Sequence, residues 1–312
     1  MRIVMMGTPD FAVPSLKALI REGYEVVGVF CQPDRPKGRG HKLAACPVKE
    51  EALRAGIPVF QPEKIKSPEG LAMLRSLEPD LCVTAAFGQL LSRDCLAVPR
   101  FGTINVHASL LPKHRGSAPV HYSIICGDKE TGITTMMTDV GMDTGDILMK
   151  ASTRISEDDT AETLTHKLSL LGAELLIETI GAMENGSLVR TPQDESRATY
   201  EPKLTRETGR IDWTKKAREI DRLVRGTDPW PAAFTTFGEE TMKVFAVRRI
   251  AGKPEAEPGT VLTADAKSGL AVACGDSVLE LLEIQMPGQR RMPAGDYLRG
   301  HSMDTGIRLG GD

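Results

Sequence analysis

Short apolar runs alternate with amphipathic stretches along the first half of the chain. Ile3–Met6 and Glu25–Phe30 are apolar runs, typical of strands that are buried on both faces of a parallel sheet. Between them, Phe11–Glu22 has its apolar residues at helical spacing, and Gly23 after it is a common helix stop. This strand–helix–strand order favours an α/β fold with a Rossmann-like, doubly wound and mostly parallel sheet.

The same alternation continues as far as residue 188. The clearest helical pattern is Thr160–Asn185, in which leucines recur on one face. Weaker patterns predict further helices at 48–55 and 71–77, and strands at 59, 81–86, 103–106 and 146–150. We therefore interpret residues 1–188 as one α/β domain.

The pattern changes after a polar, aperiodic segment at 189–206, which we interpret as a linker. Beyond it a helix is predicted at Lys216–Arg225. Short strand-like segments separated by turns follow, at 232–237, 241–249, 259–263, 270–274 and 278–284. Several short strands in so little chain predict a small C-terminal β-barrel, with an OB-like fold, within residues 207–312.

Residues 31–47, with the sequence CQPDRPKGRGHKLAACP, interrupt the alternation and are too rich in Gly and Pro to predict a helix or a strand. A basic loop of this kind suits a phosphate backbone, because each neutralised phosphate releases counterions. A solvated surface loop has the same composition, so both interpretations stay open at this point. The basic residues opposite the single acid Asp34 are Arg35, Lys37, Arg39 and Lys42.

Composition and charge narrow the class of protein without naming a function. The chain has 312 residues, which favours two domains, and a formal net charge of -3, which argues against a strongly cationic protein. Its six cysteines include no C-x-x-C pair, as expected of free thiols in a reducing cytoplasm. No signal peptide and no transmembrane run is recognisable, so we expect a cytoplasmic protein without a membrane partner.

Several common motifs are missing from the sequence. The first turn, at Gly7, lacks G-x-G-x-x-G, and no P-loop occurs, so a dinucleotide or nucleoside-triphosphate site has no support. His107, His114 and His121 recur every seven residues, but no H-E-x-x-H is present and we expect no metal.

Chemically capable groups concentrate between Gly102 and Asp146. A predicted buried strand delivers Asn105 and His107 to one face, and Asp143 lies in a glycine-rich loop before the next strand. A carboxylate beside an imidazole favours the charged ring, and an amide N–H beside an imidazolium can stabilise an oxyanion. Although a single histidine after a strand can be structural, the three residues together predict acyl transfer to an amine.

Motifs over nearly the whole chain resemble those of the folate-dependent formyltransferase family, and in particular of its members that act on methionyl-tRNA. The central ones are NVHASLLP at 105–112, Arg115-Gly116 and DVGMDTG at 139–145. The others are MRIVMMGTPDFAVPSL at the start, CQPDRPKGRG, ATYEPKLTRETGRIDW, RGTDPWPAAF and MPGQRRM. The basic loop and the C-terminal motifs are what point to a tRNA substrate.

The resemblance implies 10-formyltetrahydrofolate as the donor and the α-amine of initiator methionyl-tRNA as the acceptor. Asn105 and His107 would stabilise the oxyanion, and Asp143 would orient and charge His107. The implied tRNA contacts are Arg35, Lys37, Arg39, Lys42, Lys203 and Arg206. The implied folate contacts are Ser109, Leu110, Leu111 and Pro112, with Phe87, Gly88, Gln89, Leu90, Leu91, Asp139, Val140 and Gly141 as pocket walls.

Two residues depart from the family pattern. His114 stands before the Arg-Gly pair, where an aromatic residue is frequent, and Glu201 stands where a small residue is usual. Two alternatives also remain open: a formyltransferase acting on a sugar nucleotide or a purine precursor, or a non-catalytic tRNA-binding protein on the same fold. We expect a monomer.

Overall fold

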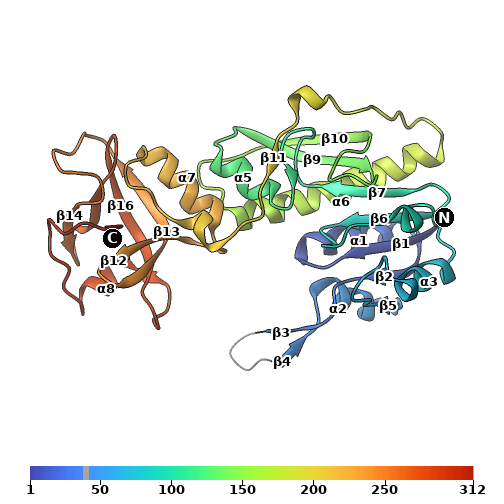
Figure 1. Cartoon of the computed structure of the whole chain (residues 1–312), viewed down its shortest axis with the longest axis horizontal. Coiled ribbons are helices and arrows are strands. Elements are labelled where there is room, and N and C mark those ends of the chain that lie inside the picture. Colours follow the sequence, from blue (N-terminus) through green and yellow to red (C-terminus); the bar gives the residue numbers. More distant parts are fainter. Residues whose placement is uncertain (38–41, 312) are drawn as a thin grey trace. The chain divides into compact units, whose positions relative to one another are not determined.

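The computed structural model describes residues 1–37 and 42–311 (Figure 1). The chain forms two compact units. Unit 1 comprises residues 1–119, 130–154 and 165–201, and unit 2 comprises residues 120–129, 155–164 and 202–312. None of the helices in the described ranges combines the length and the apolar character that crossing a bilayer requires.

Unit 1 is built on a seven-stranded sheet with the order β10-β9-β7-β6-β1-β2-β5. The five strands from β7 to β5 are parallel to one another. At the other end of the sheet, β9 pairs antiparallel with β7, and β10 pairs antiparallel with β9. The mostly parallel, Rossmann-like sheet is therefore confirmed. Its strands are β1 Arg2–Gly7, β2 Glu25–Phe30, β5 Val59–Phe60, β6 Leu81–Ala85, β7 Thr103–His107, β9 Glu130–Met137 and β10 Ile147–Arg154.

Helices alternate with these strands as the apolar periodicity predicts. The long helix α6, Ala161–Glu184, buries Leu164, Leu168 and Leu175, the face that its leucine spacing indicated. A 3-10 turn at Asp10–Ala12 precedes the first helix. The remaining helices of this part of the chain are α1 Val13–Arg21, α2 Pro47–Arg54, α3 Pro68–Ser76, α4 Arg93–Leu96 and α5 Pro119–Ile125.

Strand β9 was not predicted, although it lies between β10 and β7 in the sheet. Its sequence, ETGITTMM, contains three threonines where a buried strand usually has aliphatic residues. All three are buried, and the Thr135 hydroxyl lies 2.8 Å from that of Thr179. Threonine is β-branched and fits a strand well, and the Thr134 hydroxyl donates to the distant Ser109 carbonyl over 2.7 Å. The buried Thr131 hydroxyl has no hydrogen-bond partner within the described residues.

The expectation that residues 31–47 contain no strand was wrong. β3, Arg35–Lys37, pairs antiparallel with β4, Lys42–Ala44. Main-chain hydrogen bonds between two short strands require no apolar run, which is why the pattern did not reveal them. Arg39 lies outside the described residues, as do the side chains of Lys37 and Lys42.

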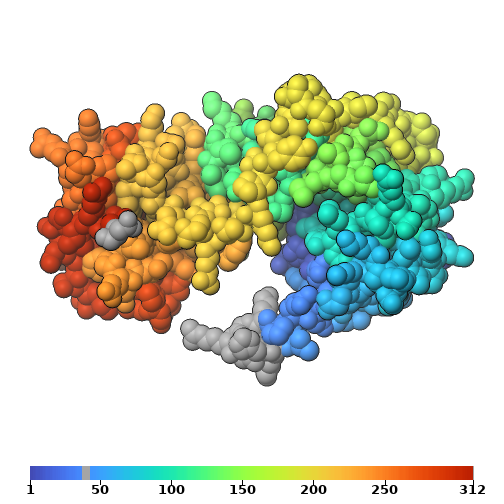
Figure 2. Space-filling model, viewed as in Figure 1, coloured from blue at the N-terminus to red at the C-terminus, as the bar shows by residue number. Residues whose placement is uncertain are grey.

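The segment interpreted as a linker also carries ordered structure in the part that belongs to unit 1. A 3-10 turn covers Glu195–Arg197, and β11, Tyr200–Glu201, pairs in parallel with β8, Arg115–Gly116. Residues 193–201, here called the 193–201 segment, therefore pack back onto unit 1. The yellow part of the chain that includes them lies on the face turned to the reader in Figure 2.

Unit 2 contains helix α7, Ala217–Thr227, and an antiparallel sheet with the order β12-β13-β16-β15-β14, in which β17 also pairs with β16. An antiparallel C-terminal domain is thus confirmed, and its first five strands fall on the predicted segments. These elements are β12 Ala233–Phe237, β13 Glu240–Ile250, β14 Val261–Asp265, β15 Gly269–Ala273, β16 Val278–Gln285, β17 Met292–Pro293 and the short helix α8 Ala294–Leu298.

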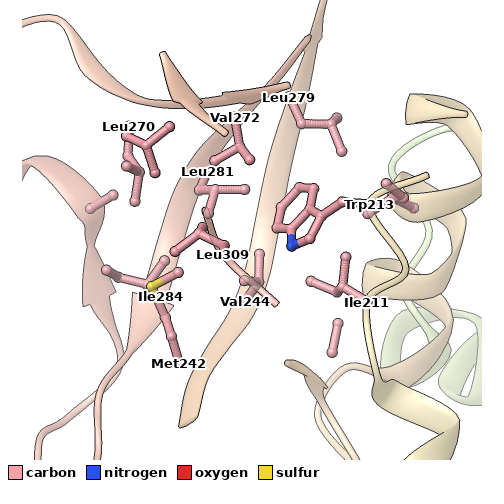
Figure 3. Close-up of a cluster of buried hydrophobic side chains, with 14 of the residues drawn as sticks. Ile211, Trp213, Met242, Val244, Leu270, Val272, Leu279, Leu281, Ile284 and Leu309 are labelled. Carbon is pink, nitrogen blue, oxygen red and sulfur yellow. The ribbon is translucent and has the colours of Figure 1, made fainter. Parts of the chain in front are cut away.

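The core of unit 2 gathers around the indole of Trp213 and the inner face of this sheet (Figure 3). The indole is buried, and its N–H donates to the Thr235 hydroxyl over 3.0 Å. Leu281 points into the cluster from β16 and is 1% exposed, whereas its neighbour Leu282 is 39% exposed. Alternation along β16 therefore sets which leucine stabilises the unit.

We predict that Leu281→Ala destabilises unit 2 by about 2–5 kcal/mol, because it removes buried methyl groups and leaves a cavity. The matched control Leu282→Ala, on the same strand, should change stability by less than about 0.5 kcal/mol. Calorimetric unfolding of both variants measures the difference. Equal shifts in the two would contradict this account of the core.

Candidate active site

The carboxyl end of β7 carries the buried imidazole of His107. Its Nδ1 lies 3.6 Å from Oδ1 of Asp143, and its Nε2 lies 3.1 Å from the main-chain oxygen of His114. Both ring nitrogens therefore face oxygen acceptors. Whichever ring nitrogen carries a proton thus has an oxygen acceptor before it.

Asn105 precedes His107 by two positions on β7, so the two side chains leave the same face of the sheet. The Thr84 hydroxyl donates to Asn105 Oδ1 over 3.0 Å. Within the described part of the chain, Asn105 Nδ2 donates to no acceptor, and the residue is half-buried. The amide N–H group is thus a donor that a ligand oxygen can use.

Asp143 is held in a loop, residues 138–146, here called the Asp143 loop. Its backbone is left-handed, with φ of 56°, which is uncommon for a residue other than glycine. Its Oδ2 accepts from the Gly116 N–H over 2.8 Å. Asp139 stabilises the first half of the loop by accepting from the Gly141 N–H over 3.0 Å. Local contacts therefore fix a conformation that the residue itself does not favour.

Behind this loop lies the guanidinium of Arg115, which is 0% exposed. It donates to both carboxylate oxygens of Glu195, over 2.9 and 2.6 Å, and to the hydroxyl oxygen of Tyr200 over 2.6 Å. It also donates twice to Gln193 Oε1, over 3.1 and 2.8 Å. These hydrogen bonds, those to Glu195 first, raise the pKa of Arg115, so the buried group keeps its charge.

His114 and Glu201, the two expected departures from the family pattern, touch one another. His114 is buried, and its Nδ1 lies 2.7 Å from Oε1 of Glu201. The His114 backbone is left-handed, with φ of 57°, and its N–H donates to the Thr199 hydroxyl over 2.8 Å. The His114 carbonyl faces His107, so the 193–201 segment contacts the candidate site through His114.

Among the residues expected to hold a folate, some are completely buried and others are only half-buried. Ser109 and Leu111 are completely buried, and the Ser109 hydroxyl donates to the Lys113 carbonyl over 2.6 Å. Leu110 and Pro112 are half-buried. Any ligand contact from this stretch would therefore come from those two side chains or from the main chain.

The expected pocket wall at 87–91 divides in the same way. Phe87 and Leu91 belong to a buried apolar cluster, whereas Leu90 is exposed. The Gln89 amide is engaged within the protein, because its Oε1 accepts from the Ile65 N–H over 2.7 Å. Val140, from the Asp143 loop, is another exposed apolar residue of the expected wall. Gly88 has a left-handed backbone.

The basic residues named from the sequence are exposed where the structure describes them. Arg35 makes a surface ion pair with Glu63 at 3.4 Å, and both side chains are largely in solvent. Lys203 and Arg206 are also exposed. In the described ranges, no group of three or more His, Cys, Asp or Glu side chains is placed to hold a metal ion.

Sequence reasoning did not single out Gln193 or Glu195, which surround Arg115. Both lie in the aperiodic segment that was interpreted as a linker. Their shared partner Arg115 lies 78 positions before Gln193 and 80 positions before Glu195. Spacing along the sequence carries no signal for such a contact.

Two family models match the chain. The model described as Formyl transferase matches residues 1–180, and the model described as Formyl transferase, C-terminal domain, matches residues 203–302. Together they span both units. The chain therefore belongs to the formyl transferase family.

Two relatives that match nearly the whole chain carry the same name. The chain is 52% identical to the methionyl-tRNA formyltransferase of Ruminiclostridium cellulolyticum, over 99% of this chain and 100% of that protein. It is 50% identical to the methionyl-tRNA formyltransferase of Bacillus subtilis, over 99% of this chain and 98% of that protein.

Solved structures share the fold at lower identity. HypX from Aquifex aeolicus superposes with a TM-score of 0.66 at 17% identity, over 97% of this chain and 49% of that one. The sugar 3N-formyl transferase WlaRD gives a TM-score of 0.66 at 18% identity, over 93% of this chain and 99% of that one. At such identities the likeness concerns the fold alone.

The Asp143 loop should not tolerate a side chain at Gly145. A Cβ atom there would lie 1.8 Å from the Met137 carbonyl oxygen, so the loop would have to move. We predict that Gly145→Ala lowers kcat on the order of 100-fold by displacing Asp143.

The matched control is Gly181→Ala on α6, where nothing lies within 4 Å of the added atom. It should leave activity unchanged and stabilise the helix by about 0.5–1 kcal/mol. Formyl-transfer kinetics and thermal unfolding of both variants measure this. Full activity of Gly145→Ala would contradict the importance of the loop position.

Proposed function

We propose that this chain transfers a formyl group from 10-formyltetrahydrofolate to the α-amine of methionyl initiator tRNA. The observation that carries the proposal is the full-length identity of 50% or more to relatives named methionyl-tRNA formyltransferase. The His107–Asp143 pair beside Asn105 supplies groups that suit this reaction. The product is N-formylmethionyl-tRNA, which serves translation initiation.

The acceptor needs little activation. A free α-amine has a pKa near 7.7–8.0, so a substantial fraction is neutral and nucleophilic at neutral pH. Its nitrogen attacks the formyl carbon, a carbon–nitrogen bond forms, and the carbonyl oxygen becomes an oxyanion. The bond from that carbon to the folate nitrogen then breaks. The proton lost by the amine is delivered to the leaving folate nitrogen, so atoms and charge balance.

Three side chains divide this work. Asn105 Nδ2 donates a hydrogen bond to the oxyanion, and the positive charge of a protonated His107 ring stabilises it electrostatically, so the stabilisation grows as the charge develops. Asp143, 3.6 Å from His107 Nδ1, stabilises the imidazolium and accepts a proton in transit. Because the carboxylate is also bound by the Gly116 N–H, its direction is fixed before substrate arrives.

A folate donor suits the apolar side chains of the expected pocket wall. The exposed apolar side chains Leu90 and Val140 and the half-buried Leu110 can cover a planar ring, and main-chain groups can read its polar edge. Two structures with the same fold are described with folates: HypX in complex with tetrahydrofolic acid, and WlaRD with 5-N-formyl-THF.

Transfer to a nucleic acid explains features outside the sheet. The sequence from 35 to 42 carries Arg35, Lys37, Arg39 and Lys42, and its described ends pair as the hairpin strands β3 and β4. Exposed Lys203 and Arg206 add positive charge in unit 2. Such residues bind phosphates and do not read bases, so they would supply affinity for tRNA and not the choice of the initiator.

The function is tested by incubating the protein with labelled 10-formyltetrahydrofolate and one acceptor at a time: charged initiator tRNA, charged elongator tRNA, or a small amine such as an amino-sugar nucleotide. We expect transfer to the initiator alone. Transfer to the small amine, or failure with every aminoacyl-tRNA, would overturn the proposal.

In the same assay, His107→Ala and Asp143→Ala should each lower kcat by roughly 100- to 1000-fold, because stabilisation of the adduct is lost. Binding of tRNA should not change. The control is His166→Ala, an exposed histidine on α6, which should retain full activity. A normal rate in either of the first two variants would refute the assigned roles.

The basic hairpin gives a separate prediction. Replacing both Arg35 and Arg39 by alanine should weaken tRNA binding and reduce the slope of log affinity against log salt by about two, one per lost phosphate contact. The control Arg75→Ala removes an exposed arginine from α3 and should leave the slope unchanged. Titrations with tRNA at several salt concentrations measure both. An unchanged slope in the double variant would exclude the hairpin from the interface.

A further inference from the structure

We propose that Gln193 is a positioning residue, which holds the Asp143 loop so that the carboxylate stays in register with His107. The inference rests on the proposed function, because it assigns Gln193 a part in that reaction without contact with substrate. Four hydrogen bonds of its amide carry the argument.

The Gln193 amide joins Arg115 to the Asp143 loop. Its Nε2 donates to the main-chain oxygens of Asp143 and Gly145, each over 2.8 Å. Its Oε1 accepts from Arg115 Nε and Nη2, over 3.1 and 2.8 Å. Two donor hydrogens and two acceptor lone pairs are the whole capacity of a primary amide, so every position is used.

The direction of the amide is set by charge. If the Gln193 amide were rotated by half a turn, its NH₂ group would face the Arg115 guanidinium and its oxygen would face two carbonyl oxygens. Arg115 cannot adapt to this, because it is fully buried and bound at its other face by Glu195 and Tyr200. The guanidinium therefore fixes the glutamine, and the glutamine fixes the loop.

The contact acts on the main chain at Asp143 and Gly145, whereas the Gly116 N–H and Asp139 bind the side chains of Asp143 and Thr144. Asp139 binds the Gly141 N–H and the Thr144 hydroxyl through its side chain. The carbonyls on either side of Thr144 are the ones that Gln193 binds. Without this amide, the main chain of Asp143 would lose a restraint on its left-handed conformation, with φ of 56°.

The distance between Asp143 and His107 makes the function sensitive to this restraint. The two groups are 3.6 Å apart, beyond the usual hydrogen-bond range, so their interaction depends on how the loop places the carboxylate. A displacement of about 1 Å at a reacting group can cost on the order of 100-fold in rate. Gln193 is therefore expected to affect the chemical step and not substrate affinity.

The decisive variant is Gln193→Glu, which keeps the size of the side chain and its contact with Arg115. It replaces both donors by an oxygen that faces two carbonyl oxygens. We expect kcat for methionyl-tRNA formylation to fall on the order of 100-fold, with KM for donor and tRNA each changed by less than about threefold. Gln193→Met, which is similar in size and uncharged, should show the same split if the glutamate variant does not fold.

The matched control is Asp194→Asn, a neighbouring and exposed change of one charge that still allows the side chain to accept from the Ser196 N–H. It should keep the parent kcat. A second measurement separates positioning from general destabilisation. In an Asp143→Asn background, Gln193→Glu should cause no further loss of kcat, because residues that act through one another are not additive.

Three outcomes overturn the inference: a kcat within about twofold of the parent, an equal loss in the Asp143→Asn background, or a loss confined to KM. A parent protein that transfers no formyl group to methionyl-tRNA overturns the proposed function and the inference with it. An active parent with an unimpaired Gln193→Glu overturns the inference alone.

Discussion

The burial of one charge, the Arg115 guanidinium, organises the functional end of unit 1. It is the largest of the fully buried side chains in the described chain. A charge removed from water requires acceptors all around it, and Glu195, Gln193 and Tyr200 supply them. Since all three belong to the 193–201 segment, that segment has to lie against the sheet.

The same contacts that satisfy the arginine build the candidate active site. Gln193 continues from Arg115 to the Asp143 loop, and Glu201 continues from the same segment to His114. Two residues that face His107 therefore depend on the docked segment. They are Asp143, which faces His107 with its carboxylate, and His114, which faces it with its carbonyl. Three non-glycine residues have left-handed backbones: Ala86 directly after β6, His114 directly before β8, and Asp143 in its loop. Such conformations persist where the surroundings over-determine them, as they do here.

Prediction from the sequence succeeded where a pattern is local. The apolar runs of β1 and β2 and the leucine spacing of α6 each report burial within one element, and each was placed correctly. Asn105 and His107 share a face because strand periodicity is local too. Prediction failed for β9 and for the 193–201 segment. Thr134 and Thr135 of the first and the polar residues of the second are bound by partners far along the chain.

His114 and Glu201 are best understood as one structural unit. An aromatic hydrocarbon ring at the position of His114 needs no polar partner, whereas a buried imidazole needs an acceptor or donor for its nitrogens. Glu201 provides that partner at 2.7 Å, and a small residue at its position could not reach. A histidine without the glutamate would leave a buried nitrogen less well satisfied, and a glutamate without the histidine would leave a partly buried carboxylate without this partner. Each of the two side chains therefore depends on the other, and the pair includes the residue whose carbonyl faces His107.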